Sequence, residues 1–239
     1  MVELTNYILD LFEWDTPATS YSEREVGSFR IHQGRYSRGM YQNYGIDDFI
    51  FFKAHRPLPI TFLEEKRGKR WYSWMLDDPP HWRAMEIYAE HSKGRVLTTG
   101  LGLGLYLQAL GNNNTVTEIT VVERSLEIIS LIEPYLPPLP NLTILQKDFY
   151  EFLNQDSSQW DTIMVDLWVA HGIKEKLDIL YHEVLPMAVV LRLKYPKASI
   201  TFHGFPTVSD IQHTSCAMIE VIMKMNSPQA SSLTGSDVR

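Results

Sequence analysis

Residues 95–104 read Arg95-Val-Leu-Thr-Thr-Gly-Leu-Gly-Leu-Gly104, and this stretch decides the fold. The apolar pair Val96 and Leu97 predicts a short strand. That strand breaks into glycines at 100, 102 and 104, and an apolar helical pattern follows over 105–110. Glycine at this spacing lets the main chain turn tightly and approach a ligand where a Cβ atom would collide. A strand, a glycine loop and a helix in this order are typical of a ligand-binding α/β fold.

The segment after the loop indicates which ligand. A second strand, 119–122, ends in Glu123, nineteen residues after Gly104. A carboxylate about 20 residues beyond a glycine loop is placed to bind both hydroxyls of a ribose. The third glycine comes one residue too early for the dinucleotide pattern G-x-G-x-x-G, and no G-x-x-x-x-G-K-[ST] phosphate loop occurs. An adenosine-containing cofactor is therefore expected, while glycines that serve only packing remain an equal alternative on this motif alone.

Composition excludes several classes of protein. The 239 residues, 44% hydrophobic and 21% charged, fit one globular domain, and the net charge of −7 argues against broad nucleic-acid binding. The basic cluster 66–70 is interpreted as a hairpin turn, with a local RNA contact as the less favoured alternative. No apolar run approaches the ~20 residues of a membrane span, and no signal peptide is expected from the first residues. The single cysteine, Cys216, suits a reducing cytoplasm, the expected location.

The chain divides by pattern into an N-terminal β-rich region, 1–76, a domain of alternating strands and helices, 77–225, and a tail, 226–239, expected to be disordered. In the first region we expect a helix over 6–12 and strands over 29–31, 48–53, 60–64 and 70–75, the last two as a hairpin. A helix over 81–91 should follow Pro79-Pro80. Beyond it we expect strands over 95–99, 118–122, 142–145, 160–165 and 198–202, and helices over 102–110, 125–133, 149–153, 173–193 and 209–225.

Two further strand ends carry polar residues. Asp148 follows the third strand and can accept a hydrogen bond from an adenine amino group, with Phe149 as an apolar wall, although Asp148 also suits a helix N-cap. Asp166 follows the fourth strand, and Trp168 comes two residues later. Ligands of open α/β sheets bind beyond the carboxyl ends of strands. These residues are therefore predicted to share one site with the glycine loop.

Four blocks carry a family resemblance: 96–104, 121–123, 146–149 and 160–166. Their order and spacing resemble the core of class I S-adenosylmethionine (SAM)-dependent methyltransferases, most similar to the spermidine synthase-like branch, over roughly residues 60–205. The resemblance implies a Rossmann-like α/β fold: a mostly parallel sheet with helices on both faces, preceded by a small β-hairpin region. It implies SAM as cofactor, held by Thr99, Gly100, Leu101, Gly102, Gly104, Glu123, Arg124, Asp148, Phe149, Asp166 and Leu167.

The sequence departs from the spermidine synthase pattern at two positions, and these departures bear on which reaction is expected. Spermidine synthases carry Asp where this chain has Leu103 and Val169. Without those carboxylates a polyamine cation is left uncompensated, which disfavours aminopropyl transfer. One predicted helix and a polar tail follow the last strand in place of the usual hairpin, so five strands are expected rather than seven.

The expected reaction is methyl transfer to a small-molecule acceptor. The candidate catalytic residues are Asp166 and His171, with His203 a further candidate base, and the candidate substrate pocket comprises Asp78, Trp168 and His203. No metal site is expected, because His81, His91 and His182 lie at no recognisable ligand spacing. The alternatives are a non-catalytic or regulatory SAM-binding protein, an aminopropyltransferase and, less favoured, an RNA methyltransferase. Aromatic residues before position 80 are expected to pack in the core, with the lining of a pocket or a homo-oligomer contact as the alternatives.

Overall fold

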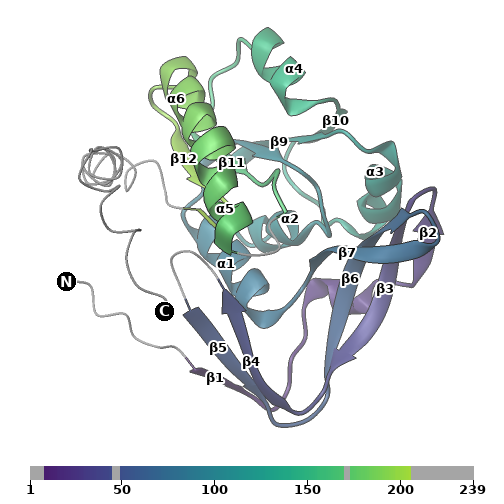
Figure 1. Cartoon of the computed structure of the whole chain (residues 1–239). Coiled ribbons are helices and arrows are strands. Elements are labelled where there is room, and N and C mark those ends of the chain that lie inside the picture. The colour runs from purple at the N-terminus through teal and green to yellow at the C-terminus, as the bar shows by residue number, and fades with distance from the viewer. Residues whose placement is uncertain (1–7, 45–48, 170–172, 206–239) are drawn as a thin grey trace, which may run out of the picture. The chain divides into compact units, whose positions relative to one another are not determined.

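Five parallel strands form the central sheet of the computed structural model, which describes residues 8–44, 49–169 and 173–205 (Figure 1). Their order is β10-β9-β8-β11-β12, and every neighbouring pair is parallel. The strands are β8 (Gly94–Thr99), β9 (Val116–Glu123), β10 (Leu142–Gln146), β11 (Thr162–Val165) and β12 (Ser199–Phe202). All five strands predicted after residue 94 are present. The described residues therefore form the five-stranded sheet that the sequence predicts.

Helices cover both faces of this sheet, as predicted. Successive strand residues point to opposite faces, yet Val96 and its neighbour Leu97 are both fully buried. Val96 shares a core cluster with residues of the first three helices, while Leu97 faces the other way. The helices are α1 (Pro79–Glu90), α2 (Leu105–Leu110), α3 (Leu126–Ile132), α4 (Phe149–Gln155), α5 (Ile173–Ile179) and α6 (Leu185–Lys194).

The strand order places a topological switch point between β8 and β11. From β8 the chain moves outward through β9 to β10, then returns across the sheet to β11 and β12. The loops after β8 and β11 therefore leave in opposite directions and open a crevice at the carboxyl ends of these strands. Residues after position 99 and after position 165 meet at this crevice.

The N-terminal region contains two sheets, more than the small hairpin region that was predicted. One has the order β2-β3-β6-β7 and is antiparallel, and the other has the order β1-β5-β4. The strands are β1 (Ile8–Leu11), β2 (Arg24–Val26), β3 (Phe29–Tyr36), β4 (Gly39–Tyr44), β5 (Phe49–Ala54), β6 (Leu58–Arg67) and β7 (Arg70–Leu76). The predicted hairpin is confirmed as β6–β7, and Gly68 turns it with φ +65°.

The helix predicted over residues 6–12 is wrong where the structure describes it. Residues 8–11 form β1, which pairs in parallel with β5. The segment has no clean helical period, and pairing with a neighbouring strand overrides such a weak local signal. Residues 6 and 7 lie outside the described residues, as do the helix predicted over 209–225 and the tail 226–239.

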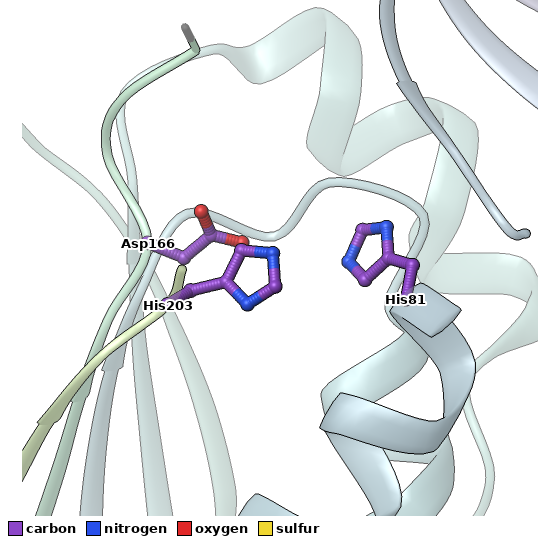
Figure 2. A group of neighbouring side chains, drawn as sticks. All are labelled: His81, Asp166 and His203. Carbon is purple, nitrogen blue, oxygen red and sulfur yellow. The ribbon is translucent and has the colours of Figure 1, made fainter. Parts of the chain in front are cut away.

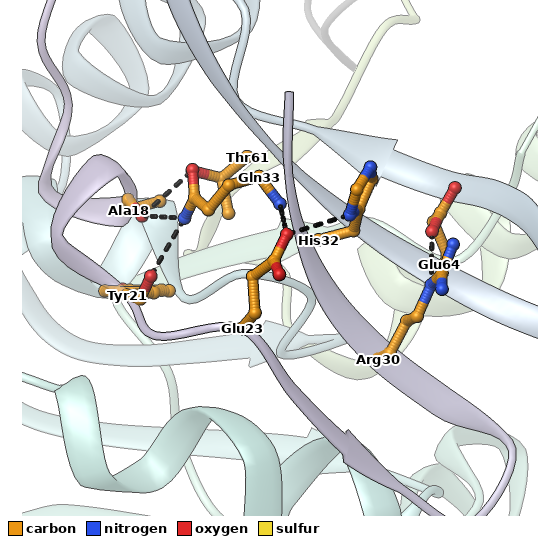
Figure 3. Close-up of polar contacts among 8 residues, drawn as sticks. All are labelled: Ala18, Tyr21, Glu23, Arg30, His32, Gln33, Thr61 and Glu64. Carbon is orange, nitrogen blue, oxygen red and sulfur yellow. Dashed lines mark hydrogen bonds and ion pairs between the residues drawn. The ribbon is translucent and has the colours of Figure 1, made fainter. Parts of the chain in front are cut away.

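Side-chain hydrogen bonds tie the 3₁₀ turn η1 (Pro17–Ser20) to the four-stranded sheet (Figure 3). The amide of Gln33 on β3 donates to the backbone oxygens of Tyr21 at 2.9 Å and Ala18 at 3.4 Å. The hydroxyl of Thr61 on β6 donates to the same Ala18 oxygen at 2.9 Å. Nearby, Arg30 and Glu64 form an ion pair of 2.6 Å across β3 and β6. The segment before β2 is thereby fixed beside the sheet that leads into α1.

Two helix predictions differ from the structure by more than a shift of one or two residues at an end. Helix α2 begins at Leu105 rather than 102, because Gly104 is its N-cap with φ +72°. The long helix predicted over 173–193 is divided into α5, a π-helical segment η3 (Leu180–Val184) and α6. Pro186, the second residue of α6, lacks the N–H that a regular α-helix needs, and the irregular turn lies just before it.

All described residues belong to one unit, residues 1–205. The domain boundaries at 76/77 and 225/226 stay predictions. Within the described ranges, none of the helices combines the length and the apolar character that crossing a bilayer requires.

Candidate functional site

A pocket of about 770 Å³ opens at the switch point. Most of the predicted site residues line it: Asp78, Gly100, Gly102, Glu123, Arg124, Asp148, Phe149, Asp166, Leu167, Trp168 and His203. Thr99, Leu101 and Gly104 do not line it, and His171 lies outside the described residues. We call the part formed by Gly100, Glu123 and Asp148 the glycine-loop end, and the part formed by His81, Asp166 and His203 the histidine end.

The glycine loop is shaped by packing as well as by the pocket. Gly100 has φ +73°, and a Cβ atom there would lie 2.4 Å from the backbone oxygen of Asp166. A Cβ on Gly102 would meet the sulfur of Met75 at 2.3 Å, and one on Gly104 would meet Leu136 at 2.8 Å. All three glycines have positive φ, and at Gly100 the close approach is to backbone, so protein packing accounts for glycine there without a ligand. The conformation of the loop therefore does not distinguish ligand binding from packing. The evidence for a ligand site has to come from the polar groups around the loop.

Glu123 is held rigidly at the end of β9. Its side chain is buried, and each carboxylate oxygen accepts one backbone hydrogen bond, from the N–H of Leu101 at 2.8 Å and from that of Ser125 at 2.7 Å. A carboxylate oxygen has two lone-pair sites, so each oxygen can accept one further hydrogen bond. The predicted residue Leu101, which does not line the pocket, therefore acts on this carboxylate through its main chain.

Asp148 and Phe149 stand at the end of β10, beside Glu123. One oxygen of Asp148, Oδ1, caps α4 by accepting from the N–H groups of Tyr150 at 2.9 Å and Glu151 at 3.3 Å. Both functions considered for Asp148 can coexist, because its second oxygen has no part in this cap. The ring of Phe149 is buried and lines the pocket, and the exposed Arg124 lies on the same wall.

Asp166 links the two ends of the pocket. Its backbone N–H donates to the hydroxyl of Thr99 at 3.0 Å, which fixes the end of β11 against the end of β8. Thr99 is fully buried, so it positions the loop rather than contacting a pocket ligand. Trp168 lines the pocket two residues later, with its ring 6.0 Å from that of Phe205.

Three side chains from distant segments meet at the histidine end (Figure 2). His81 comes from the first turn of α1, Asp166 follows β11, and His203 follows β12. One potential ligand atom of each lies within 4.8 Å of the others, and the two imidazole rings are 4.8 Å apart between centroids. His81 was not among the predicted site residues. Its only sequence signal was its place directly after Pro79-Pro80, because nothing local relates it to Asp166 or His203.

Burial shifts the pKa of every titratable group at this end. It raises the pKa of Asp166 to about 6, partly opposed by His81, and it lowers the pKa of His81 to about 4. Burial also lowers the pKa of His203 to about 4, and the charge of Lys176 acts in the same direction. Asp78, which caps α1 by accepting from the N–H of His81 at 2.8 Å, has its pKa raised to about 7 by burial. At neutral pH both imidazoles are therefore neutral.

The N-terminal sheet supplies a pocket wall that is absent from the predicted site residues. Phe29 on β3 and Trp74, Met75 and Leu76 on β7 line the pocket. For Trp74, pocket lining is one of the alternatives that the sequence leaves open beside core packing, since an aromatic strand gives no signal that separates a core face from a pocket wall. None of the basic residues in the 66–70 turn lines the pocket. Lys66 pairs with Glu25 at 3.4 Å and Arg67 with Glu65 at 2.7 Å.

No family model matches the sequence, and no curated protein is similar to it. Among solved structures, the chain is similar to precorrin 8w decarboxylase of Methanobacterium thermoautotrophicum, with 19% identity and a TM-score of 0.38 over 53% of this chain and 62% of that one. A SAM-dependent methyltransferase of Agrobacterium tumefaciens gives 14% identity and a TM-score of 0.40, over 83% and 75% of the two chains.

A third structure is a SAM-dependent methyltransferase of Thiobacillus denitrificans in complex with S-adenosyl-L-homocysteine (SAH), with 14% identity and a TM-score of 0.35 over 52% of this chain and 48% of that one. The chain thus spans less than two thirds of the length of the precorrin 8w decarboxylase and of the Thiobacillus enzyme. Similarity at this level assigns no function, which has to be argued from the pocket itself.

Proposed function

We propose that this protein is a SAM-dependent methyltransferase acting on a small-molecule acceptor. The observation that carries the proposal is the glycine-loop end of the pocket, where Glu123 is fixed at the end of β9 with lone pairs to spare. Membership of the spermidine synthase-like branch is part of the same proposal. The antiparallel sheet that precedes the parallel one supports it.

The polar groups at this end fit an adenosyl ligand. The two ribose hydroxyls are donors, and the free lone pairs of Glu123 are matching acceptors. The second oxygen of Asp148 is an acceptor for the adenine amino group, beside the buried ring of Phe149. Adenine and ribose are thereby recognised by two carboxylates at the ends of adjacent strands. Gly100, Gly102 and Asp166 line the pocket next to these groups and would hold the remaining part of the ligand.

When bound, SAM supplies a methyl group on a positively charged sulfur, which leaves as the neutral thioether of SAH. The protein has to align the acceptor with that carbon and exclude water. Trp168, Trp74 and Phe29 provide apolar walls for this purpose. An acceptor O–H or N–H loses its proton as the new bond to carbon forms, and Asp166 or His203 can take that proton. His171 stays a predicted alternative base.

The size and charge of the site favour a small acceptor. The pocket volume of about 770 Å³ lies within the usual range for small-molecule sites, roughly 300–1,000 Å³. The net charge of −7 and the place of the 66–70 turn away from the pocket lining give no support to an RNA acceptor. A partly apolar small molecule agrees best with these walls.

Methyl transfer is tested by measuring the conversion of SAM to SAH in the presence of a small-molecule fraction. Purified protein is incubated with SAM and a protein-free extract of small molecules, and SAH is measured by mass spectrometry. The proposal predicts SAH that depends on protein and extract. Binding of SAM without SAH formation would identify a non-catalytic binder instead. A product formed from decarboxylated SAM and putrescine would identify an aminopropyltransferase.

A further inference from the structure

The histidine end holds two buried nitrogen atoms without hydrogen-bond partners. Among the described residues, Nε2 of His81 and Nδ1 of His203 are buried and accept or donate no hydrogen bond. A buried, unpaired polar atom costs free energy, about 1–3 kcal/mol, and calls for an explanation. His81 and His203 form one cluster with Asp166 (Figure 2), and Nε2 of His81 is turned toward the other two side chains, so a ligand bound among them would satisfy that nitrogen.

The tautomer of His81 is set by its second nitrogen. Nδ1 of His81 lies 2.7 Å from the backbone oxygen of Leu76, which can only accept. Nδ1 therefore carries the hydrogen, and Nε2 presents a lone pair toward His203 and Asp166. An imidazole that donates one N–H to a carbonyl and offers the other nitrogen is the usual arrangement of a histidine that binds metal.

We propose that His81, Asp166 and His203 bind one divalent transition-metal ion at the histidine end of the pocket. Two imidazoles and one carboxylate suit Zn²⁺, Fe²⁺ or Co²⁺ better than Mg²⁺ or Ca²⁺, which favour oxygen ligands. Ligand atoms bound at about 2.0–2.2 Å stand roughly 3.3 Å apart. The widest pair here, at most 4.8 Å, has to close by about 1.5 Å, which side-chain rotation can supply.

The three ligands leave coordination positions that face the pocket, since all three residues line it. The charge of Lys176 opposes a cation near His203, and the carboxylate of Asp166 offsets that charge. A metal ion here would bind an oxygen or nitrogen atom of the acceptor and favour loss of its proton. That role rests on the proposed function, whereas metal binding itself does not.

The experiment is a titration of tag-free, EDTA-treated protein with Co²⁺, followed by visible absorption, and with Zn²⁺, followed by calorimetry. We expect one equivalent of each ion to bind. His81→Asn keeps a donor for the Leu76 oxygen, because the Asn amide replaces Nδ1–H, but it removes Nε2. This variant and Asp166→Asn should each weaken Co²⁺ binding at least about 100-fold.

The matched control is His91→Asn on the same helix. His91 is exposed, and its Nδ1 also lies 2.8 Å from a backbone oxygen, that of Ile87. His91→Asn should bind Co²⁺ as the wild type does, and thermal unfolding followed by circular dichroism verifies that each variant folds. Absence of stoichiometric binding, or equal affinity of His81→Asn and His91→Asn, would overturn the proposal. SAH binding, measured on the same stripped protein, reports separately on the proposed function.

Discussion

The two ends of the pocket differ in how their polar groups are satisfied. At the glycine-loop end, both oxygens of Glu123 and one oxygen of Asp148 already accept backbone N–H groups. At the histidine end, buried nitrogens of His81 and His203 have no partner within the described residues, and burial shifts the pKa of all three side chains. The named oxygens at the first end each have a protein partner and can still accept from a ligand, whereas the two nitrogens at the second end have no protein partner.

This difference indicates that the two ends of the pocket have different functions. Preformed acceptors of fixed direction suit recognition of a constant ligand, such as a ribose and an adenine. Unpaired groups with shifted pKa values suit the end where a proton is moved or a metal ion is bound. Specificity for the acceptor and the chemistry of the reaction should therefore depend on the histidine end, and affinity for the adenosyl ligand on the other.

The largest effect is expected where the two ends touch. Gly100→Ala would place a Cβ atom 2.4 Å from the backbone oxygen of Asp166, at φ +73°. Overpacking against backbone and left-handed strain together should lower the free energy of unfolding by about 3 kcal/mol or more. Chemical denaturation measures this.

Gly68→Ala is the control for that substitution. Gly68 has a similar φ of +65°, but a Cβ atom there meets nothing within 4 Å. Only the strain remains, so the loss should be about 1 kcal/mol. Equal losses at both glycines would contradict the close approach of Gly100 to the backbone oxygen of Asp166.

A pH-dependent effect is expected at Asp77, which precedes the helix that carries His81. The buried carboxylate accepts hydrogen bonds from Thr16 and from the N–H of Thr61, and burial raises its pKa to about 6. The folded state therefore binds this proton more tightly than the unfolded state. The resulting stability is fully present below about pH 4 and is lost as the pH rises through about 6.

Asp77→Asn should remove this dependence, because the amide stays neutral. Relative to the wild type, the variant should gain about 2 kcal/mol in unfolding free energy between pH 4.5 and pH 7.5. Denaturation curves at both pH values measure the gain, with the exposed Glu133→Gln as control. A constant difference between variant and wild type at the two pH values would contradict the assignment.

A smaller effect is expected at Asp148, and it concerns ligand affinity. Asp148→Asn keeps the oxygen that caps α4 and replaces the second oxygen by an amide nitrogen, which repels an adenine amino group. Affinity for SAH should fall about tenfold, with unfolding temperature little changed. Glu151→Gln, an exposed change on the same helix, should leave affinity unaltered. If Asp148 served only as a helix cap, Asp148→Asn and Glu151→Gln would both bind SAH as the wild type does, which would contradict the prediction.

The parallel sheet and the glycine-loop end could be predicted because their signals are local. Strand, glycine loop and acidic residue lie within thirty residues of one another, from Arg95 to Glu123, and their spacing fixes their geometry. The histidine end could not be predicted as a cluster. His81 and His203 are far apart in the sequence, on α1 and after β12, and only the tertiary fold brings them together. The helix predicted over the segment 8–11 is wrong for a similar reason, because pairing with β5 determines the structure of that segment.

The most direct test of the account is a calorimetric titration of the purified protein with SAH, performed on wild type, Glu123→Gln and the control Glu133→Gln. The amide of Glu123→Gln turns a donor toward a backbone N–H and removes an acceptor for the ribose. We predict one bound equivalent for wild type and control, and affinity at least about tenfold lower for Glu123→Gln. Absence of heat and of any thermal shift with SAH or SAM in the wild-type protein would contradict the account.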